Sequence, residues 1–205
     1  MSAPTPESDL CAAADAGVPV VLIGIEHPTL ATVRIDDVEA GRLAAQHLID
    51  LGHRRIAVVG EGASEDWRGS ATHDRRRGFA LAMETAGIAW DPRLDVHSDF
   101  TVRGGARSAE ALWAMPDRPT AVLALSDEMA LGVLGSAQAA NIAVPSELSV
   151  IGIDDHDATA VLGLTTVAQP VETLGELAAL QMVAHLDTGG RVERKQLRQP
   201  VSLIV

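Results

Sequence analysis

Apolar residues recur along the chain in two patterns that predict alternating β-strands and α-helices. Residues 118–155 show both patterns most clearly. The runs AVLAL and SVIGI are short and continuously apolar, as in strands buried on both faces of a sheet. The segment between them keeps one apolar face at helical spacing, formed by Met129, Val133, Leu134 and Ala137. We therefore predict a strand, a helix that stops near Asn141 and Pro145, and a second strand.

The ends of these two strands are a candidate ligand site. A strand, helix and strand connected over this length form a parallel, right-handed unit, so both strands end at the same edge of the sheet. Ser126 and Asp127 follow the first strand, and Asp154 and Asp155 end the second. Small ligands bind at this edge in open α/β sheets. We expect these side chains to lie close to such a ligand.

The same alternation continues over most of the chain and predicts a doubly wound α/β protein. Strands are expected in the segments PVVLIGI, TVRID, IAVVG, LDVHS and QLRQPVSLIV, with Pro200 confining the last to an edge or bulge position. Helices are expected over residues 6–16, from Asp36 or Asp37 to 51, and over 72–86, 101–115 and 171–187. The inward positions of the last helix are expected to be Leu174, Leu177, Leu180 and Val183. Gly104 and Gly105 weaken the prediction for 101–115.

Charge and composition narrow the functional classes. The 205 residues carry a formal net charge of −12, which argues against binding to nucleic acid or a membrane surface, because phosphate contacts need clustered Lys and Arg. The length allows one large domain or two small ones. Cys11 is the one cysteine, so no internal disulfide forms. No apolar run approaches the ~20 residues of a membrane span, and no secretory signal is visible. We expect a soluble, cytoplasmic protein.

The sequence offers little for metal or nucleophilic chemistry. Residues 154–157 include Asp and His, but consecutive loop residues point in different directions, whereas metal ligands must converge. GEG at residues 60–62 lacks the spacing of a phosphate-binding loop, and no serine stands in a G-x-S-x-G context. We expect no metal, no cofactor and no enzymatic activity. A small-molecule hydrolase on this scaffold stays an alternative that a turnover assay would reveal.

Seven segments together carry a resemblance to a known family. In order along the chain they are PVVLIG, VRIDDVEAGRLAAQHLIDLGHRRIAVVG, DRRRGFALAMETAGI, HSDFTVRGGARSAEAL, RPTAVLALSDEMALGVL, VPSELSVIGIDD and LTTVAQPVETLGELAA. Their order and spacing resemble the effector-binding domain of LacI and GalR transcription regulators. The resemblance implies a periplasmic-binding-protein-like fold of two α/β subdomains with doubly wound parallel sheets, joined by hinge crossovers. It also implies a homodimer and a small effector in the cleft between the subdomains.

The resemblance further implies how the chain is divided. Residues 1–53 with 166–188 would form the N-terminal effector subdomain, and 54–165 with 189–205 the C-terminal one. The strands that precede PVVLIG in the family have no counterpart in this sequence, so we expect an N-terminally truncated domain with an incomplete N-terminal subdomain. DNA binding would require a helix-turn-helix domain that this sequence does not contain.

The resemblance places two principal ligand-binding candidates. Arg75, in DRRRGF, matches a position whose guanidinium grips the effector, and its planar fork of donors suits vicinal hydroxyls or a carboxylate. The alternative is a solvated basic helix face shared with Arg76 and Arg77. Asp154 matches the strand-end carboxylate that accepts hydrogen bonds from the effector in the family. A helix cap or a loop ion pair is its alternative.

Other candidates are less specific. Asp127 stands at a helix start, so we expect it to cap the helix, with ligand contact through it or Ser126 as the less favoured alternative. Phe100 matches an aromatic position that often stacks on the ligand ring, and a core position is equally open. Asp36 matches a position that reaches the cleft in some members. Trp67 either hangs over the cleft or, as we favour, packs on its own subdomain.

The chain also departs from the family. Gly24 and Ile25 replace a polar pair that members often carry after the VVLI strand, which removes one expected polar contact. This fits a different effector or a degraded pocket. We expect the ligand-sensing core of a LacI-type regulator that binds a small sugar-like or nucleoside-like effector by cleft closure. A periplasmic-type solute-binding protein and a fragment without ligand binding are the alternatives.

Overall fold

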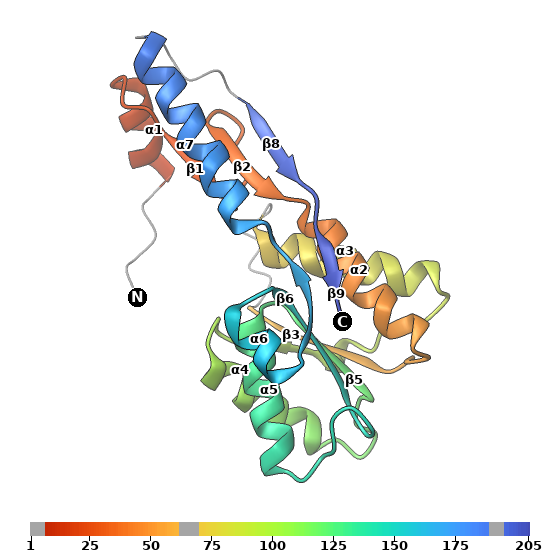
Figure 1. Cartoon of the computed structure of the whole chain (residues 1–205). Helices are drawn as coiled ribbons and strands as arrows, with labels where there is room; N and C mark the ends of the chain where they lie inside the picture. The colour runs from red at the N-terminus through yellow and green to blue at the C-terminus, as the bar shows by residue number, and fades with distance from the viewer. Residues whose placement is uncertain (1–6, 62–69, 189–194) are drawn as a thin grey trace. The chain divides into compact units, whose positions relative to one another are not determined.

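The structure is a computed structural model that describes residues 7–61, 70–188 and 195–205. It consists of two compact units (Figure 1). The smaller unit contains Met1–Asp36 and Pro170–Pro200, and the larger unit contains Asp37–Gln169 and Val201–Val205. The chain therefore passes between the units three times. The predicted α/β architecture with two sheets and several crossovers is confirmed.

The larger unit is built on a six-stranded sheet in the order β4-β3-β5-β6-β7-β9. Its strands are β3 (Ile56–Gly60), β4 (Asp95–His97), β5 (Ala121–Ala124), β6 (Ser149–Asp154), β7 (Thr165–Ala168) and β9 (Ser202–Ile204). The first five strands in this order are parallel, and β9 pairs antiparallel with β7. Every residue of β3 and β5 is buried, as continuous apolar runs predict for central parallel strands.

Helices cover both faces of this sheet. They are α2 (Asp37–Asp50), α3 (Ala71–Thr85), α4 (Val102–Trp113), α5 (Asp127–Ala139) and the short α6 (Asp157–Leu162), with a 3-10 turn η2 (Pro92–Leu94). Figure 1 shows α2 and α3 on one side of the sheet and α4 and α5 on the other. Thr101 caps α4 by accepting a hydrogen bond from the Gly104 amide, as the sequence predicts for this helix.

Glycines set the close approach within each helix pair. A Cβ atom on Gly41 of α2 would lie 1.9 Å from the Arg75 carbonyl oxygen of α3. In the other pair, a Cβ on Gly105 of α4 would lie 2.2 Å from the Met129 carbonyl oxygen of α5. A side chain at either position would force the helices apart. Gly105, one of the two glycines that weaken the helix prediction for 101–115, is thus required by the packing of α4 on α5.

The smaller unit has a three-stranded parallel sheet in the order β1-β2-β8. Its elements are α1 (Glu7–Asp15), β1 (Val21–Ile23), β2 (Ala31–Ile35), α7 (Val171–Thr188) and β8 (Gln196–Gln199). The helix α7 packs on β1 and β2 through residues such as Leu174, which is 4% exposed. The prediction that Leu180 and Val183 face inward is wrong, because they are 64% and 52% exposed.

The boundaries between the two units lie at other residues than the predicted subdomain boundaries. The segment TTVA is a strand, β7, which pairs with β6 and so belongs to the larger unit rather than to the unit of α7. The helix α2 also belongs to the larger unit, because it packs on α3 and near β6. The tail forms two strands in two different sheets, separated at Pro200, and not one edge strand.

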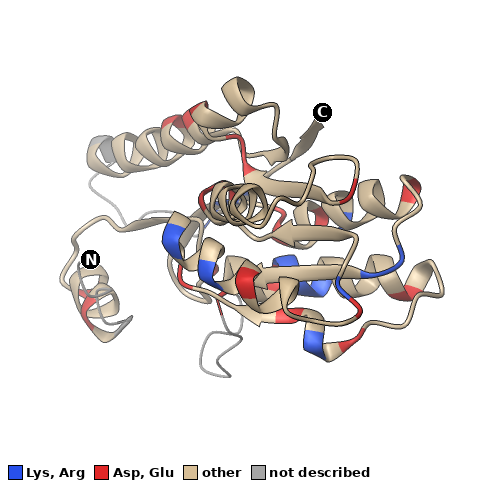
Figure 2. Ribbon diagram, turned by 90° about the horizontal axis from the view of Figure 1, so that it is seen from below, with Lys and Arg blue, Asp and Glu red and all other residues tan. Residues whose placement is uncertain are grey.

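The length and the charge of the helices are relevant to membrane and nucleic-acid binding. Within the described residues, no helix is long and apolar enough to span a membrane. Figure 2 shows acidic residues, coloured red on the ribbon, in both units, and neither α1 nor α7 contains a Lys or Arg. The smaller unit's two helices therefore lack the clustered basic residues that phosphate contacts need.

Candidate ligand-binding site

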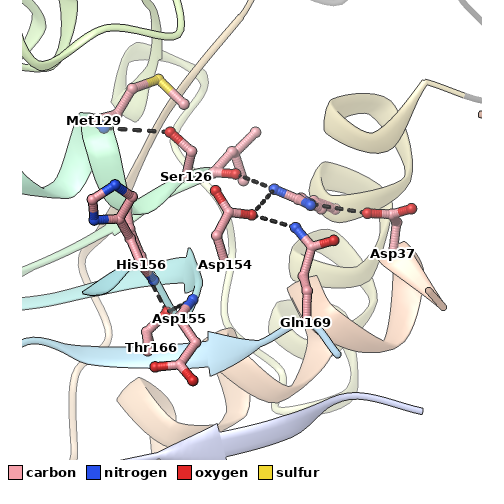
Figure 3. A network of polar contacts seen from close by, with 11 residues as sticks. Asp37, Ser126, Met129, Asp154, Asp155, His156, Thr166 and Gln169 are labelled. Atoms are coloured by element: carbon pink, nitrogen blue, oxygen red, sulfur yellow. Dashed lines mark hydrogen bonds and ion pairs between the residues drawn. The ribbon is translucent and has the colours of Figure 1, made fainter. Parts of the chain in front are cut away.

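Polar side chains gather where the parallel strands of the larger unit end (Figure 3). Ser126 follows β5, Asp154 ends β6, and Gln169 follows β7. Arg75 reaches this edge from α3 and binds the Leu125 carbonyl oxygen at 2.5 Å. Parallel strands bring their carboxyl ends to one edge, so segments far apart in the sequence meet here. The predicted ligand edge is therefore lined by polar groups.

Arg75 is held by several acceptors inside the protein. Its Nε donates to Oδ1 of Asp37 at 2.9 Å, and its Nη1 donates to Oδ1 of Asp154 at 3.4 Å as well as to Leu125. The Arg75 side chain is 5% exposed and that of Asp37 is 3% exposed. The two Arg75–carboxylate contacts differ, because 32% of the Asp154 side chain is exposed. Asp154 is therefore the most exposed of the three charged side chains Arg75, Asp37 and Asp154.

Asp154 combines burial with several hydrogen-bond donors. Its Oδ1 accepts from Nε2 of Gln169 in addition to Nη1 of Arg75. Burial raises the pKa of the Asp154 carboxyl above its ordinary value, and the charge of Arg75 and the Gln169 hydrogen bond partly oppose this shift. Asp154 has φ of 140° and Asp155 has φ of 61°, which L-residues adopt at a cost. Strain of this kind is concentrated at functional sites.

Ser126 and not Asp127 caps the helix α5. Ser126 caps α5, because its Oγ accepts a hydrogen bond from the Met129 amide at 3.3 Å. The prediction that Asp127 is the cap is wrong. Asp127 is fully buried, and its carboxylate accepts from Thr166 Oγ1 at 2.7 Å and from the His156 amide at 2.8 Å. These hydrogen bonds connect α5 to β7 and to the loop that follows Asp154.

The remaining predicted residues are Phe100 and Asp36. Phe100 is 40% exposed in the turn between β4 and α4. Asp36 belongs to the smaller unit, where Oδ2 lies 3.8 Å from Nη1 of Arg198. Gly24 also lies there and has φ of 77°, which suits glycine. Trp67 lies outside the described residues.

The arginines that follow Arg75 differ in their surroundings. Arg76 is 7% exposed, and its Nε donates to Oδ1 of Asp95 at 3.0 Å. Its other nitrogens bind the carbonyl oxygens of Gly60 and Glu61. Arg77 is largely exposed and lies 3.6 Å from Asp74. A solvated basic face therefore describes Arg77 and not its two neighbours.

Two members of the site were not predicted from the sequence. Gln169 follows β7, and its place at a strand end becomes visible only when TTVA is recognised as a strand. Asp37 lies next to the predicted Asp36, and the sequence contains no signal that the second carboxylate of the pair binds Arg75. Among the described residues, no three His, Cys, Asp or Glu side chains converge as metal ligands would.

A cavity of about 370 Å³ is lined by residues of the smaller unit. It is bounded by α1, the segment after α1, Thr29–Ala31 and His185. None of the predicted site residues lines it. We favour the strand-end edge as the ligand site, because it combines buried charges with an exposed acceptor and a strained backbone, which this cavity lacks among the residues that line it.

Comparison with known proteins identifies the family. Residues 45–205 match the model of the periplasmic binding protein-like domain. The chain is 36% identical over 170 residues to the HTH-type transcriptional repressor CytR of Escherichia coli (strain K12), which covers 80% of the chain and 49% of the relative. It superimposes on a LacI family transcriptional regulator from Mycobacterium smegmatis with a TM-score of 0.83 and 31% identity, covering 96% of the chain and 72% of that structure. The chain belongs to the LacI family of transcriptional regulators.

Another LacI-family structure shows that a relative binds a sugar. The regulator from Enterococcus faecium, solved with bound ribose, matches with a TM-score of 0.87 and 28% identity over 98% of this chain and 74% of that one. These relatives are transcriptional regulators and not enzymes. This LacI-family chain spans about half the length of the curated relatives it matches.

Proposed function

We propose that the chain is the effector-binding core of a transcriptional regulator and that Arg75 and Asp154 bind a small sugar-like or nucleoside-like effector. The observation that carries the proposal is their pairing at the strand-end edge, with Nη1 and Oδ1 3.4 Å apart. A buried guanidinium beside a partly exposed carboxylate offers donors and acceptors to neighbouring hydroxyls. Ribose bound to the Enterococcus faecium relative supports this class of effector.

The other candidates take supporting roles in the proposal. Phe100 offers an exposed ring at the end of β4, where it would stack on the apolar face of a sugar or base. Ser126 and Asp127 would support the site, because both are buried. Ser126 caps α5, and Asp127 binds the loop that follows Asp154.

The regulator would respond to effector by a shift between two conformations, because a ligand biases an equilibrium through its different affinities for the two states. We propose a cytoplasmic homodimer that contacts DNA through a helix-turn-helix domain outside this sequence. The name of the related repressor CytR, an HTH-type protein, supports that organisation.

A thermal-shift titration tests effector binding. Ligands that bind the native state raise the midpoint of unfolding, because they stabilise it by RT ln(1 + [L]/Kd). The panel should contain pentoses, hexoses, disaccharides, nucleosides and purines. We expect a saturable rise with at least one sugar or nucleoside. A folded protein whose unfolding midpoint responds to none of them would overturn the proposal.

Two neighbouring carboxamide substitutions then test the site. Asp154→Asn keeps the size of the side chain but removes the charged acceptor, and we expect it to weaken effector binding about tenfold, since such hydrogen bonds contribute about 1.5–3 kcal/mol. Asp155→Asn is the matched control, because the Asp155 side chain is exposed and Asn also tolerates a positive φ. Equal losses for the two variants in isothermal titration would contradict the assignment to Asp154.

A further inference from the structure

The positive charge of Arg75 is already matched inside the protein. Nε of Arg75 and Oδ1 of Asp37 are 2.9 Å apart, and both side chains are almost fully buried. Opposite charges in such surroundings are screened far less than charges in water. A ligand that reaches Arg75 therefore meets a guanidinium whose field is largely cancelled by Asp37.

Further carboxylates make the site acidic. Asp154 contacts the other side of the same guanidinium, and the fully buried Asp127 lies near enough for its charge to raise the pKa of Asp154. Among the described residues, the groups connected in this way are three carboxylates and one guanidinium. A phosphate or carboxylate on a ligand would add to this excess of negative charge, which repels anions in a poorly screened site.

The hydrogen-bonding groups that remain suit hydroxyls. Nη2 of Arg75 makes no hydrogen bond to any residue that the structure describes, so its N–H groups can donate to a ligand oxygen. The side-chain donors to Asp154 both reach Oδ1, and with 32% of that side chain exposed, Oδ2 can accept from a ligand. A vicinal diol supplies both an acceptor and a donor, whereas an ammonium group supplies donors alone and would face the guanidinium.

We propose that the effector is an uncharged polyhydroxy compound and that Asp37, by neutralising Arg75, makes the site reject phosphorylated effectors. This inference rests on the proposed function, because it assumes that Arg75 and Asp154 contact the effector. Asp37 is a positioning residue in this scheme. It acts on the ligand through the charge and orientation of Arg75.

Matched ligands test the inference on the unaltered protein. Isothermal titration should compare ribose with ribose 5-phosphate, cytidine with cytidine 5′-monophosphate, and glucose with both glucose 6-phosphate and glucosamine. We expect each uncharged compound that binds to do so about tenfold more tightly than its charged counterparts, as repulsion of little more than one kcal/mol would produce. Equal or tighter binding of a phosphorylated compound or of glucosamine would overturn the inference and leave the proposed function standing. If no compound of any pair binds, the proposed function fails and the inference falls with it.

The neighbouring Arg76–Asp95 pair provides a matched control for Asp37. In both pairs an aspartate Oδ1 accepts from an arginine Nε, at 2.9 Å for Asp37 and 3.0 Å for Asp95. Arg76 also binds backbone carbonyl oxygens, and among the described residues no hydrogen bond or ion pair joins it to Asp154. Removing the Asp95 charge should therefore leave the choice between charged and uncharged ligands unchanged.

The variants Asp37→Asn and Asp95→Asn separate a charge effect from a structural one. We expect Asp37→Asn to reduce the preference for the uncharged member of a ligand pair about tenfold, because it removes one of the two carboxylates that offset the charge of Arg75. Asp95→Asn should keep the preference within about twofold of the unaltered protein. Circular dichroism establishes that each variant is folded. An unchanged preference in a folded Asp37→Asn protein would overturn the role of Asp37, and the ligand pairs on the unaltered protein decide the ligand class if that variant does not fold.

Discussion

A Cβ atom added to Gly152 of β6 would lie 2.0 Å from Oδ1 of Asp127. The buried carboxylate thus occupies the space that a side chain at position 152 would need. From that space it accepts hydrogen bonds from Thr166 Oγ1 and from the His156 amide. The absence of a side chain on β6 therefore allows Asp127 to connect the strand ends beneath the candidate site.

Gly152→Ala should lower the free energy of unfolding by about 2–3 kcal/mol, because it either displaces Asp127 or distorts β6. Urea denaturation measures the change. A double-mutant cycle with Asp127→Ala is the control, since shortening residue 127 removes the oxygen that the new methyl group would meet. We expect the cost of Gly152→Ala to shrink in that background. Strictly additive effects would show that Asp127 is not the residue displaced.

Two glycines of α5 offer a matched test of helix packing. A Cβ on Gly132 would lie 2.0 Å from the Val102 carbonyl oxygen of α4, whereas a Cβ on Gly135 would meet no atom within 4 Å. Gly132→Ala should lower the free energy of unfolding by about 1–3 kcal/mol as α4 is pushed away. Gly135→Ala should instead raise it by about 0.5–1 kcal/mol, because alanine favours the helix. Thermal or urea unfolding that ranks the two variants alike would contradict this account.

The raised pKa of Asp154 predicts a definite pH dependence. The folded protein binds the proton of the Asp154 carboxyl more tightly than the unfolded chain, in which the pKa of this group is 3.8. Ionised Asp154 therefore disfavours folding at pH values above the folded-state pKa. That penalty is relieved as the pH falls through the folded-state pKa toward 3.8. Asp154→Asn should therefore be most favourable relative to the unaltered protein near neutral pH, and its relative stability should decline by about pH 4.

Urea unfolding of the unaltered protein and of Asp154→Asn at a series of pH values measures this difference. Removing the charge of Asp154 leaves Arg75 paired with Asp37, so no uncompensated cation complicates the comparison. Carbon-13 NMR of the Asp154 carboxyl gives a direct reading. A titration midpoint below 3.8 would show that Arg75 and Gln169 outweigh burial.

Most strands and helices follow from the sequence, and the exceptions have physical causes. β7 contains Thr165 and Thr166, and a polar residue inside a sheet obscures the apolar run that marks a strand. Thr166 is polar because it donates to Asp127. Pro200 interrupts the ladder as expected, but the sequence alone does not reveal that the chain continues in another sheet. Helical periodicity predicts which residues share a face of α7, while burial of Leu180 depends on a neighbouring surface that periodicity does not supply.

The candidate site, too, was predicted from the sequence only in part. Strand-end position and family resemblance indicate Arg75 and Asp154, and the structure brings their side chains within 3.4 Å. Their partners Asp37 and Gln169 depend on how α2 packs on α3 and on the placement of β7. Such pairings are decided by tertiary geometry, so residue type and local pattern leave them open.

The order of β7, β8 and β9 along the chain has a consequence for biosynthesis. β7 and the strand that covers it, β9, are separated by the whole Pro170–Pro200 portion of the smaller unit. As the polypeptide leaves the ribosome, β7 emerges before its antiparallel partner, and β2 waits much longer for β8, because residues 36–195 lie between them. Neither sheet can be finished before the other is under way. The nascent chain must therefore carry two open sheet edges at once, at the stage when unpaired edges are most exposed to aggregation and to chaperones.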